Sequence, residues 1–150
     1  MHRTLEGAEM GPLQRSRATL RIAGDELIPD EISHLLGCLP TSSRRKGEEI
    51  SGKTSGQKHV AISGLWRLTA SPREPEDLDG QIDEILIRLT DDLKVWKALS
   101  QRYSVDLFCG LFMGCGNEGL SLSASSLQAL GARGIELGLD IYGPDDPDDA

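Results

Sequence analysis

The sequence predicts a mixed α+β fold, a two-layer sandwich in which a mixed sheet of four to five strands carries three helices mainly on one face. Four segments alternate apolar with polar residues, which is typical of strands that bury only one face. Three other segments space their apolar residues three or four apart, as amphipathic helices do. A chain of 150 residues, 38% hydrophobic and 27% charged, suits a single domain with its own core.

The chain is expected to begin with an extension and a strand. Residues 1–16 show no periodicity, so we expect a flexible N-terminal extension there. In the strand expected at 17–23, Ala18, Leu20 and Ile22 point to one face and the intervening residues to the other.

A helix is expected next, at 29–37, because both of its ends carry signals. Pro29 fits the first turn, and Asp30 and Glu31 suit the positive end of the helix dipole. Gly37 supplies a C-cap. The acidic residues of this stretch are therefore explained by helix capping rather than by catalysis.

Residues 41–58 are polar and rich in serine and glycine, which indicates a long loop or an irregular hairpin. The second strand is expected at 59–70, with Val60, Ile62 and Trp66 on its buried face.

The longest helix is expected at 77–102. Its apolar stripe has spacings of four, three, four and three residues, through Ile82, Leu86, Leu89, Leu93 and Trp96. Such a seam also occurs in coiled coils, but the flanking strands favour packing on a sheet.

The C-terminal third repeats the pattern of strand, helix and strand. A strand is expected at 104–113, a helix capped by Ser123, and a last strand at 135–142. The remaining residues, 143–150, form an acidic tail whose composition predicts disorder. The single domain is therefore expected to span 17–142.

An internal repeat of two βαβ units is a further possibility. Residues 27–37 align without gaps with residues 122–132, and each segment lies between two strands. Chance similarity between two amphipathic helices is the alternative. Helices on one face of an alternating sheet make a ferredoxin-like arrangement the nearest common fold.

The uncovered sheet face is the strongest candidate for an interaction surface. The residues expected there combine charge with aromatic rings: Arg21, Arg67, Phe108, Phe112, Asp140 and Tyr142. The alternative is that the N-terminal extension or the 41–58 loop covers the two phenylalanines.

One segment matches the sequence motif of a phosphate-binding loop. The segment from Gly47 to Thr54 matches G-x-x-x-x-G-K-T. Such a loop must open a helix, whose N-terminal amides face the phosphates. Here it leads into a strand, and Glu48 and Glu49 repel phosphate, so we reject nucleotide hydrolysis.

No catalytic, metal or cofactor site is expected. The three cysteines, Cys38, Cys109 and Cys115, lack framework spacing and a companion histidine for zinc. A net charge of −8 disfavours nucleic acid as a partner. The chain has no apolar run long enough for a membrane span, and no signal peptide is evident, so we expect a cytoplasmic protein.

Several motifs resemble a bacterial family of small proteins, the domain of unknown function numbered 4279. They are A-T-L-R-I-x-G-D-x-L-x-P-D-E-I at 18–32, L-L-G-x-x-P-T at 35–41, K-G-E at 46–48, Trp66, and L-x-L-D-I-Y at 137–142. The resemblance implies a compact mixed domain of bacterial origin. It implies no activity and supplies no catalytic residue.

Two functional hypotheses follow. The first is a non-enzymatic module that binds a protein partner or a second copy of itself through the open sheet face, with an immunity-type protein as one version. The second is a small ligand-binding protein or enzyme that uses the polar loop, with Asp25, Lys46 and Glu48 converging in a concave site.

Overall fold

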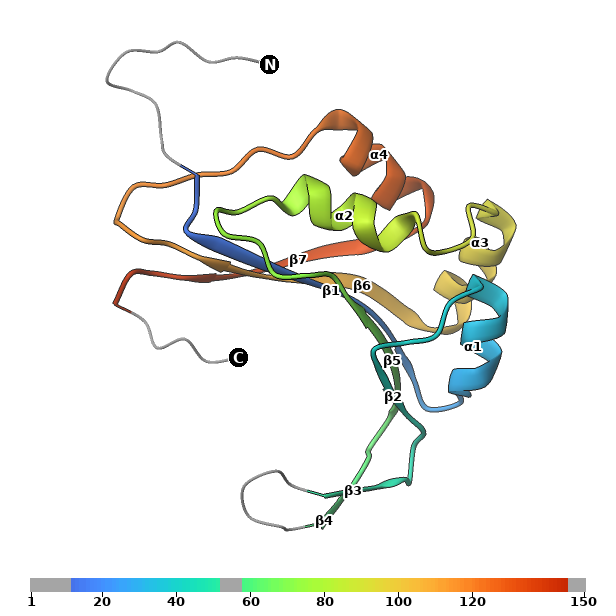
Figure 1. Ribbon diagram of the computed structural model, residues 1–150. Coiled ribbons are helices and arrows are strands. Elements are labelled where there is room, and N and C mark those ends of the chain that lie inside the picture. The colour runs from blue at the N-terminus through green and yellow to red at the C-terminus, as the bar shows by residue number, and fades with distance from the viewer. Residues whose placement is uncertain (1–11, 52–57, 146–150) are drawn as a thin grey trace.

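The computed structural model describes residues 12–51 and 58–145 of the chain. Within these ranges the chain forms seven strands and four helices (Figure 1). In order they are β1 (Arg15–Gly24), α1 (Pro29–Leu36), β2 (Ser42–Arg44), β3 (Glu49–Ser51), β4 (Lys58–Val60), β5 (Gly64–Thr69), α2 (Leu78–Leu86), α3 (Leu93–Arg102), β6 (Ser104–Phe112), α4 (Ala124–Ala132) and β7 (Glu136–Tyr142).

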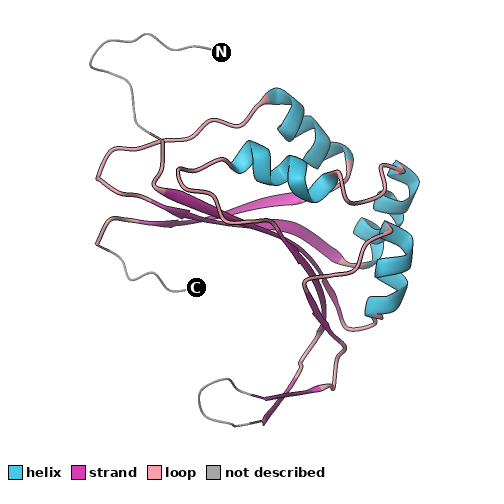
Figure 2. Cartoon of the chain, viewed as in Figure 1, coloured by secondary structure: helices cyan, strands magenta, loops and turns pink. Residues whose placement is uncertain are grey.

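Five strands form one curved sheet in the order β2-β5-β1-β6-β7, and β3 and β4 form a separate hairpin. β6 and β7 run parallel, whereas the other neighbours in the sheet are antiparallel. Figures 1 and 2 show the described helices on the convex side of the sheet, so that its concave side faces away from them. The mixed α+β fold with a five-stranded sheet is therefore confirmed.

The core lies between the convex side of the sheet and the helices. In β1, Ala18, Leu20 and Ile22 are fully buried, as their alternation predicted. The neighbouring strands and the helices complete the core with Trp66, Leu68, Leu107, Cys109, Leu111, Ile32, Leu36, Ile82, Ile85, Trp96 and Leu99. Each large apolar side chain that is fully buried contributes about 1.5–3 kcal/mol to stability.

The strand at the N-terminus begins slightly earlier than predicted, because β1 starts at Arg15. Leu13 is already buried, and the backbone N–H of Gln14 donates to the carbonyl of Phe112. Of the predicted extension 1–16, residues 1–11 lie outside the described residues. The same is true of 146–150 in the predicted tail.

The prediction of one continuous helix at 77–102 is wrong, because α2 ends at Leu86 and α3 begins at Leu93. The segment between them is tied to α1: the backbone N–H of Thr90 donates to the carbonyl of Leu36 at 2.9 Å. The Asp92 side chain then caps α3 by accepting from the backbone N–H of Lys94 at 3.0 Å. The apolar stripe could not reveal this break, since both helices face the same core.

Only the second half of the proposed repeat has the predicted topology. β6, α4 and β7 form a parallel βαβ unit, but β1 and β5 are antiparallel neighbours, so the first βαβ unit is wrong. The ferredoxin-like arrangement is not confirmed either. A split βαβ fold places a strand between the two parallel strands, whereas β6 and β7 are directly paired.

The strand predicted at 59–70 is interrupted. β4 ends at Val60 and β5 begins at Gly64, so Val60 and Ile62 are exposed instead of lying in the core. Gly64 marks a close approach of two strands, since a Cβ atom at this position would lie 2.7 Å from the carbonyl oxygen of Gly24. Its lack of a side chain is therefore required by packing.

The polar segment 41–58 contains strands as well as a turn. β2 extends the sheet beside β5, and β3 pairs with β4. The described part of the G-x-x-x-x-G-K-T segment therefore leads into a strand. Lys53 and Thr54, where a phosphate-binding helix would have to begin, lie outside the described residues.

β7 is an edge strand, and part of its apolar face is uncovered. Leu139 and Ile141 pair in register with Cys109 and Leu111 on the helix side of the sheet, but they are 47% and 56% exposed. Among the described helices, none is long and apolar enough to span a bilayer.

Candidate binding site on the concave sheet face

The structure places all six residues predicted for the open sheet face around one hollow of about 440 Å³. Its complete lining is Arg17, Thr19, Arg21, Arg67, Phe108, Gly110, Phe112, Asp140 and Tyr142, and we call this the concave hollow. The strand register explains the convergence. Arg67 of β5 lies opposite Arg21 of β1, and Arg17 lies opposite Gly110, which pairs with Asp140 of β7.

Aromatic rings and guanidinium groups alternate across the concave hollow. Phe112 and Tyr142 stack with their ring centroids 4.9 Å apart and their planes 6° from parallel. The guanidinium carbon of Arg15 lies 3.8 Å from the centroid of Phe112, and that of Arg21 lies 4.5 Å from the centroid of Phe108. Such cation–π contacts attract the guanidinium group to the ring and so hold both side chains in place.

The two phenylalanines differ in their burial. Phe112 is only 7% exposed, whereas Phe108 is 36% exposed. The described contacts of Phe112 are with Tyr142 and arginines of the same face. Phe108 therefore offers the more accessible apolar surface in the concave hollow.

Gly110 keeps the floor of the concave hollow open. A Cβ atom at Gly110 would lie 3.4 Å from the Phe112 ring and 3.9 Å from Cβ of Arg17, both ordinary contact distances. A larger side chain would therefore fit the strand but project into the hollow.

One ion pair anchors the basic side of this face. Arg21 donates through Nε to Oδ1 of Asp106 at 2.8 Å and through Nη2 to Oδ2 at 2.6 Å. The hydrogen bond to Asp106 raises the pKa of Arg21, and the nearby carboxylate charge adds to this effect against the cost of burial. This bidentate geometry fixes the guanidinium plane.

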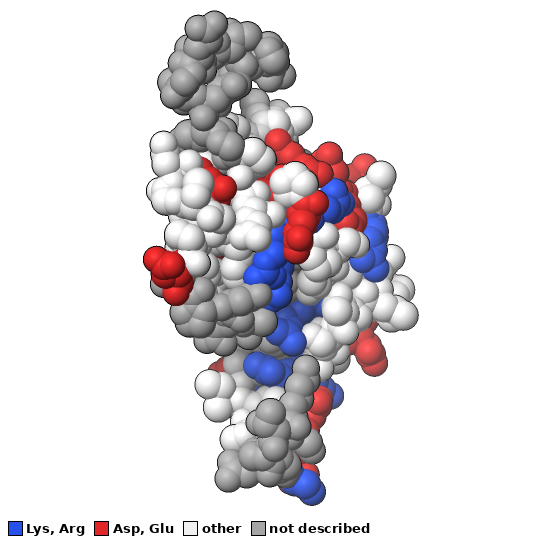
Figure 3. Space-filling model, turned by 60° about the vertical axis from the view of Figure 1, so that its left-hand side comes forward, with Lys and Arg blue, Asp and Glu red and all other residues white. Residues whose placement is uncertain are grey.

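Positive charge is concentrated on this face although the chain has a net charge of −8. Figure 3 shows basic side chains that follow one another down the middle of the molecule, over the concave side of the sheet. Arg17, Arg21 and Arg67 line the concave hollow, and Arg44 joins Arg21 and Arg67 around a second hollow beside it. The local charge is thus opposite in sign to that of the whole chain.

Sequence reasoning did not place three of these arginines on the concave face. Arg17 has the same parity as Thr19 and Arg21, so the alternation of β1 contained the signal. Arg15 was assigned to the extension, and Arg44 to a loop, because β2 is too short to show periodicity.

The predicted polar-loop site is brought together only in part. Lys46 Nζ forms an ion pair with Oδ2 of Asp25 at 3.2 Å, but both side chains are largely exposed. Glu48 turns back on its own loop, where Oε1 accepts from the backbone N–H of Arg45 at 3.3 Å. The hollow that Glu48 lines is bordered by neither Asp25 nor Lys46.

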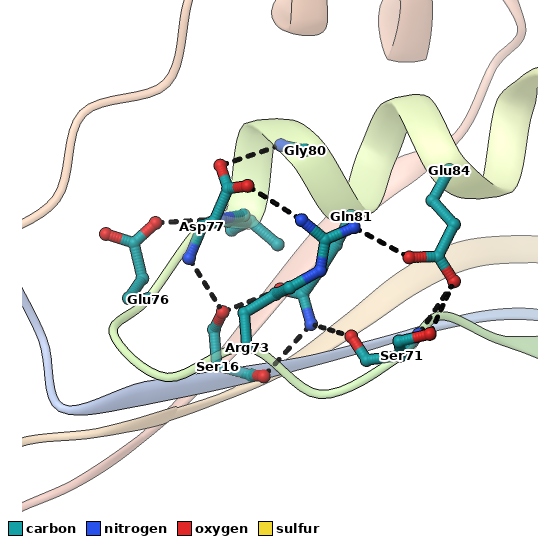
Figure 4. Close-up of polar contacts among 9 residues, drawn as sticks. Ser16, Ser71, Arg73, Glu76, Asp77, Gly80, Gln81 and Glu84 are labelled. Atoms are coloured by element: carbon teal, nitrogen blue, oxygen red, sulfur yellow. Dashed lines mark hydrogen bonds and ion pairs between the residues drawn. The ribbon is translucent and has the colours of Figure 1, made fainter.

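A buried polar network holds β1 in place beneath the concave hollow (Figure 4). Ser16 Oγ donates to Oε1 of Gln81 at 2.6 Å, and Nε2 of Gln81 donates to the carbonyls of Ser16 and Ser71 at 3.0 Å each. Because Ser16 lies between Arg15 and Arg17, these bonds to α2 fix the strand from which both arginines project.

The outer part of the network is an ionic clamp. Arg73 bridges Asp77, through Nη1 at 2.8 Å, and Glu84, through Nη2 at 2.7 Å. The bond from Arg73, together with those from Ser71, holds the pKa of the Glu84 carboxyl below its usual range. The clamp joins the turn before α2 to the helix itself.

The described residues contain no group of three or more His, Cys, Asp or Glu side chains arranged to hold a metal ion. The three cysteines are unpaired: Cys109 is buried, Cys38 is half-buried and Cys115 is exposed. Burial, with a smaller contribution from the Asp106 charge, raises the pKa of Cys109 to about 12.

We expect the three thiols to react with a maleimide at separate rates. The thiolate is the nucleophile, so the exposed Cys115 should react first and Cys109 only after unfolding, as peptide mapping by mass spectrometry would show. Cys115→Ser should remove the fast phase. Prompt labelling of Cys109 in the folded protein would contradict the buried position of this strand.

A sequence profile of the family described as "Domain of unknown function (DUF4279)" matches residues 14–144. The chain belongs to this family. The matched range includes every described strand and helix, and thus the whole concave face. No curated protein and no solved structure gives a significant match.

Proposed function

We propose that this member of the family is a non-enzymatic binding module that captures a protein partner on its concave sheet face. One observation carries the proposal: arginine and aromatic side chains from four strands converge in an open hollow on the side of the sheet away from the described helices. Arginine, tyrosine and phenylalanine are enriched at protein interfaces, and arginine and tyrosine dominate their binding energy.

The charge distribution supports a partner with an acidic surface. Such a surface is repelled by most of an acidic chain and attracted to the basic concave face, which orients the encounter. The alternative partner on the concave face is a second copy of the chain, which is acidic overall. Measuring the molecular mass in solution at several concentrations separates the two.

An immunity-type protein that occludes a toxin is one version of this proposal. The small size of the chain and its surplus of acidic residues support that version. We place the protein in the bacterial cytoplasm, which the three unpaired cysteines support because free thiols are usual in a reducing compartment. A toxin encoded by the neighbouring reading frame would identify the partner to test first.

The test begins with affinity capture from the native cell, followed by binding measurements with the purified partner. Arg67→Glu is expected to weaken binding by about tenfold or more, since it opposes like charges across the interface. Arg67 is suited to charge reversal because the described hydrogen bond of its side chain is to the uncharged Ser42 Oγ. Arg21 is unsuited, since an acid there would face Asp106.

Two further variants make the measurement decisive. Gly110→Leu fills the concave hollow without changing charge, and it should weaken binding as strongly as Arg67→Glu. Arg88→Glu carries the same charge change on an exposed position beyond α2, and it should leave binding within about twofold of the native value. Equal affinity in all three variants would show that the partner binds elsewhere.

A further inference from the structure

We propose that Arg21, Arg44 and Arg67 form a binding site for an oxyanion, either a carboxylate or a phosphate group. We call these three residues the arginine site. They surround a hollow of about 300 Å³ whose other lining residues are Ala23, Leu65, Ser104 and Asp106. This inference deepens the proposed function and rests on it, because the oxyanion would be the group by which the partner is anchored.

Strand pairing brings the three guanidinium groups together. Arg21 of β1 lies directly opposite Arg67 of β5, and Arg67 lies opposite Ser42 of β2. Arg44 is two residues beyond Ser42, so it projects from the same face. Like charges directly opposite one another on adjacent strands repel. Asp106 offsets the charge of Arg21, and a bound anion would offset the charge of Arg67.

Only one of the three arginines is neutralised by a carboxylate among the described residues. Arg21 is paired with Asp106 on the side away from Arg67. Arg67 donates through Nε to Ser42 Oγ at 2.9 Å. Neither Arg44 nor Arg67 forms an ion pair within the described part of the chain, so the arginine site carries an excess of two positive charges.

Arg44 shows the clearest need for a partner. Its Nε is buried and has no hydrogen-bond partner within the described residues. Buried N–H groups are almost always satisfied in folded proteins. An oxyanion in the adjoining hollow would accept from the other N–H groups of Arg44, because a guanidinium group presents several donors in a plane that fits carboxylate and phosphate oxygens.

The acids closest in sequence do not supply that acceptor. Glu48 and Glu49 line a neighbouring hollow together with Arg44 and Arg67, but neither glutamate forms an ion pair with these arginines among the described residues. However, Glu48 Oε1 accepts from the backbone N–H of Arg45. These two carboxylates lie on one side of the arginine site, where they lower the positive potential, so the anion is expected to bind on the side of Arg21 and the concave hollow.

The experiment measures binding of inorganic phosphate and of malonate to the full chain by isothermal titration calorimetry, at constant ionic strength maintained with sodium chloride. Saturable binding of either probe is expected. Tighter phosphate binding assigns the site to phosphoryl groups, and tighter malonate binding assigns it to carboxylates. Absence of saturable binding of both probes would overturn the inference.

Arg44→Gln is expected to lower the affinity for the more tightly bound probe by about tenfold, because it removes a charged donor from the site. Arg45→Gln is the matched control, since it makes the same change at an adjacent, exposed position, and it should change the affinity by less than about twofold. Equal losses of affinity in both variants would show that the probes respond only to the overall charge of the chain, and the proposed site would be wrong. If Arg44→Gln does not fold, Arg67→Gln replaces it.

The same variants distinguish this inference from the proposed function. If the partner binds Arg44→Gln as well as the native chain while Gly110→Leu blocks it, the concave face is the interface and the oxyanion anchor is wrong. If the probes bind the arginine site, but neither Arg67→Glu nor Gly110→Leu weakens binding of any captured partner, the oxyanion site stands and the proposed interface on the concave face fails.

Discussion

Trp66→Ala is expected to lower the free energy of unfolding by about 3–5 kcal/mol, the usual cost of removing a fully buried tryptophan. Trp66 is 0% exposed and lies in β5, next to the central strand β1 of the sheet. Its Nε1 donates to Ser33 Oγ at 3.0 Å, which ties the sheet to α1. The substitution therefore creates a cavity and leaves a serine hydroxyl without its partner. Urea denaturation followed by circular dichroism measures the loss.

Two comparisons separate the cavity from the hydrogen bond. Trp66→Phe keeps most of the ring volume, so it should lower the free energy of unfolding by less than the alanine variant does. Phenylalanine cannot donate to Ser33, so part of the remaining loss comes from the missing hydrogen bond. Ile62→Ala changes an apolar side chain that is 88% exposed, and it should change stability by less than about 0.5 kcal/mol. A loss below about 1 kcal/mol for Trp66→Ala would contradict the described packing of β5.

The sequence predicted the buried face of the two longest strands, because the alternation of apolar and polar residues reflects burial of one face of a strand. Leu20 and Ile22 in β1, and Leu107 and Leu111 in β6, are all buried as their spacing indicated. The same logic placed Arg21 and Phe108 together on the opposite face. Within one strand, residues two apart share a face, so the residues that alternate with the buried ones lie on the opposite face, whatever the order of the strands.

The alternation of apolar and polar residues, however, does not determine the order of the strands in a sheet. The first βαβ unit was wrong because periodicity does not distinguish a parallel return from an antiparallel one. The break between α2 and α3 was missed since it depends on a tertiary bond from Thr90 to Leu36. Arg44 was not placed on the concave face for a similar reason: three residues of β2 gain their strand conformation from pairing with β5, and no local pattern indicates that pairing.

Gln81→Leu is the second substitution with a large expected effect, a loss of about 2–4 kcal/mol in the free energy of unfolding. Gln81 is fully buried, and its amide holds both the side chain and the carbonyl of Ser16 as well as the carbonyl of Ser71. A leucine of similar size would fill the space but leave these groups without their partner. Gln101→Leu, the same change on an exposed position of α3, should alter stability by less than about 0.5 kcal/mol.

A double-mutant cycle tests whether Ser16 and Gln81 act as one unit. Ser16→Ala removes the hydroxyl that donates to Gln81 and accepts from the backbone N–H of Asp77. Each single variant removes the same hydrogen bond. The loss in the free energy of unfolding of the double variant should therefore be smaller than the sum of the two single losses by at least about 0.5 kcal/mol. Strictly additive losses would show that the two side chains are not bonded. Since Ser16 separates Arg15 from Arg17, weaker partner binding in Gln81→Leu would further show that this buried network positions the basic side of the concave face.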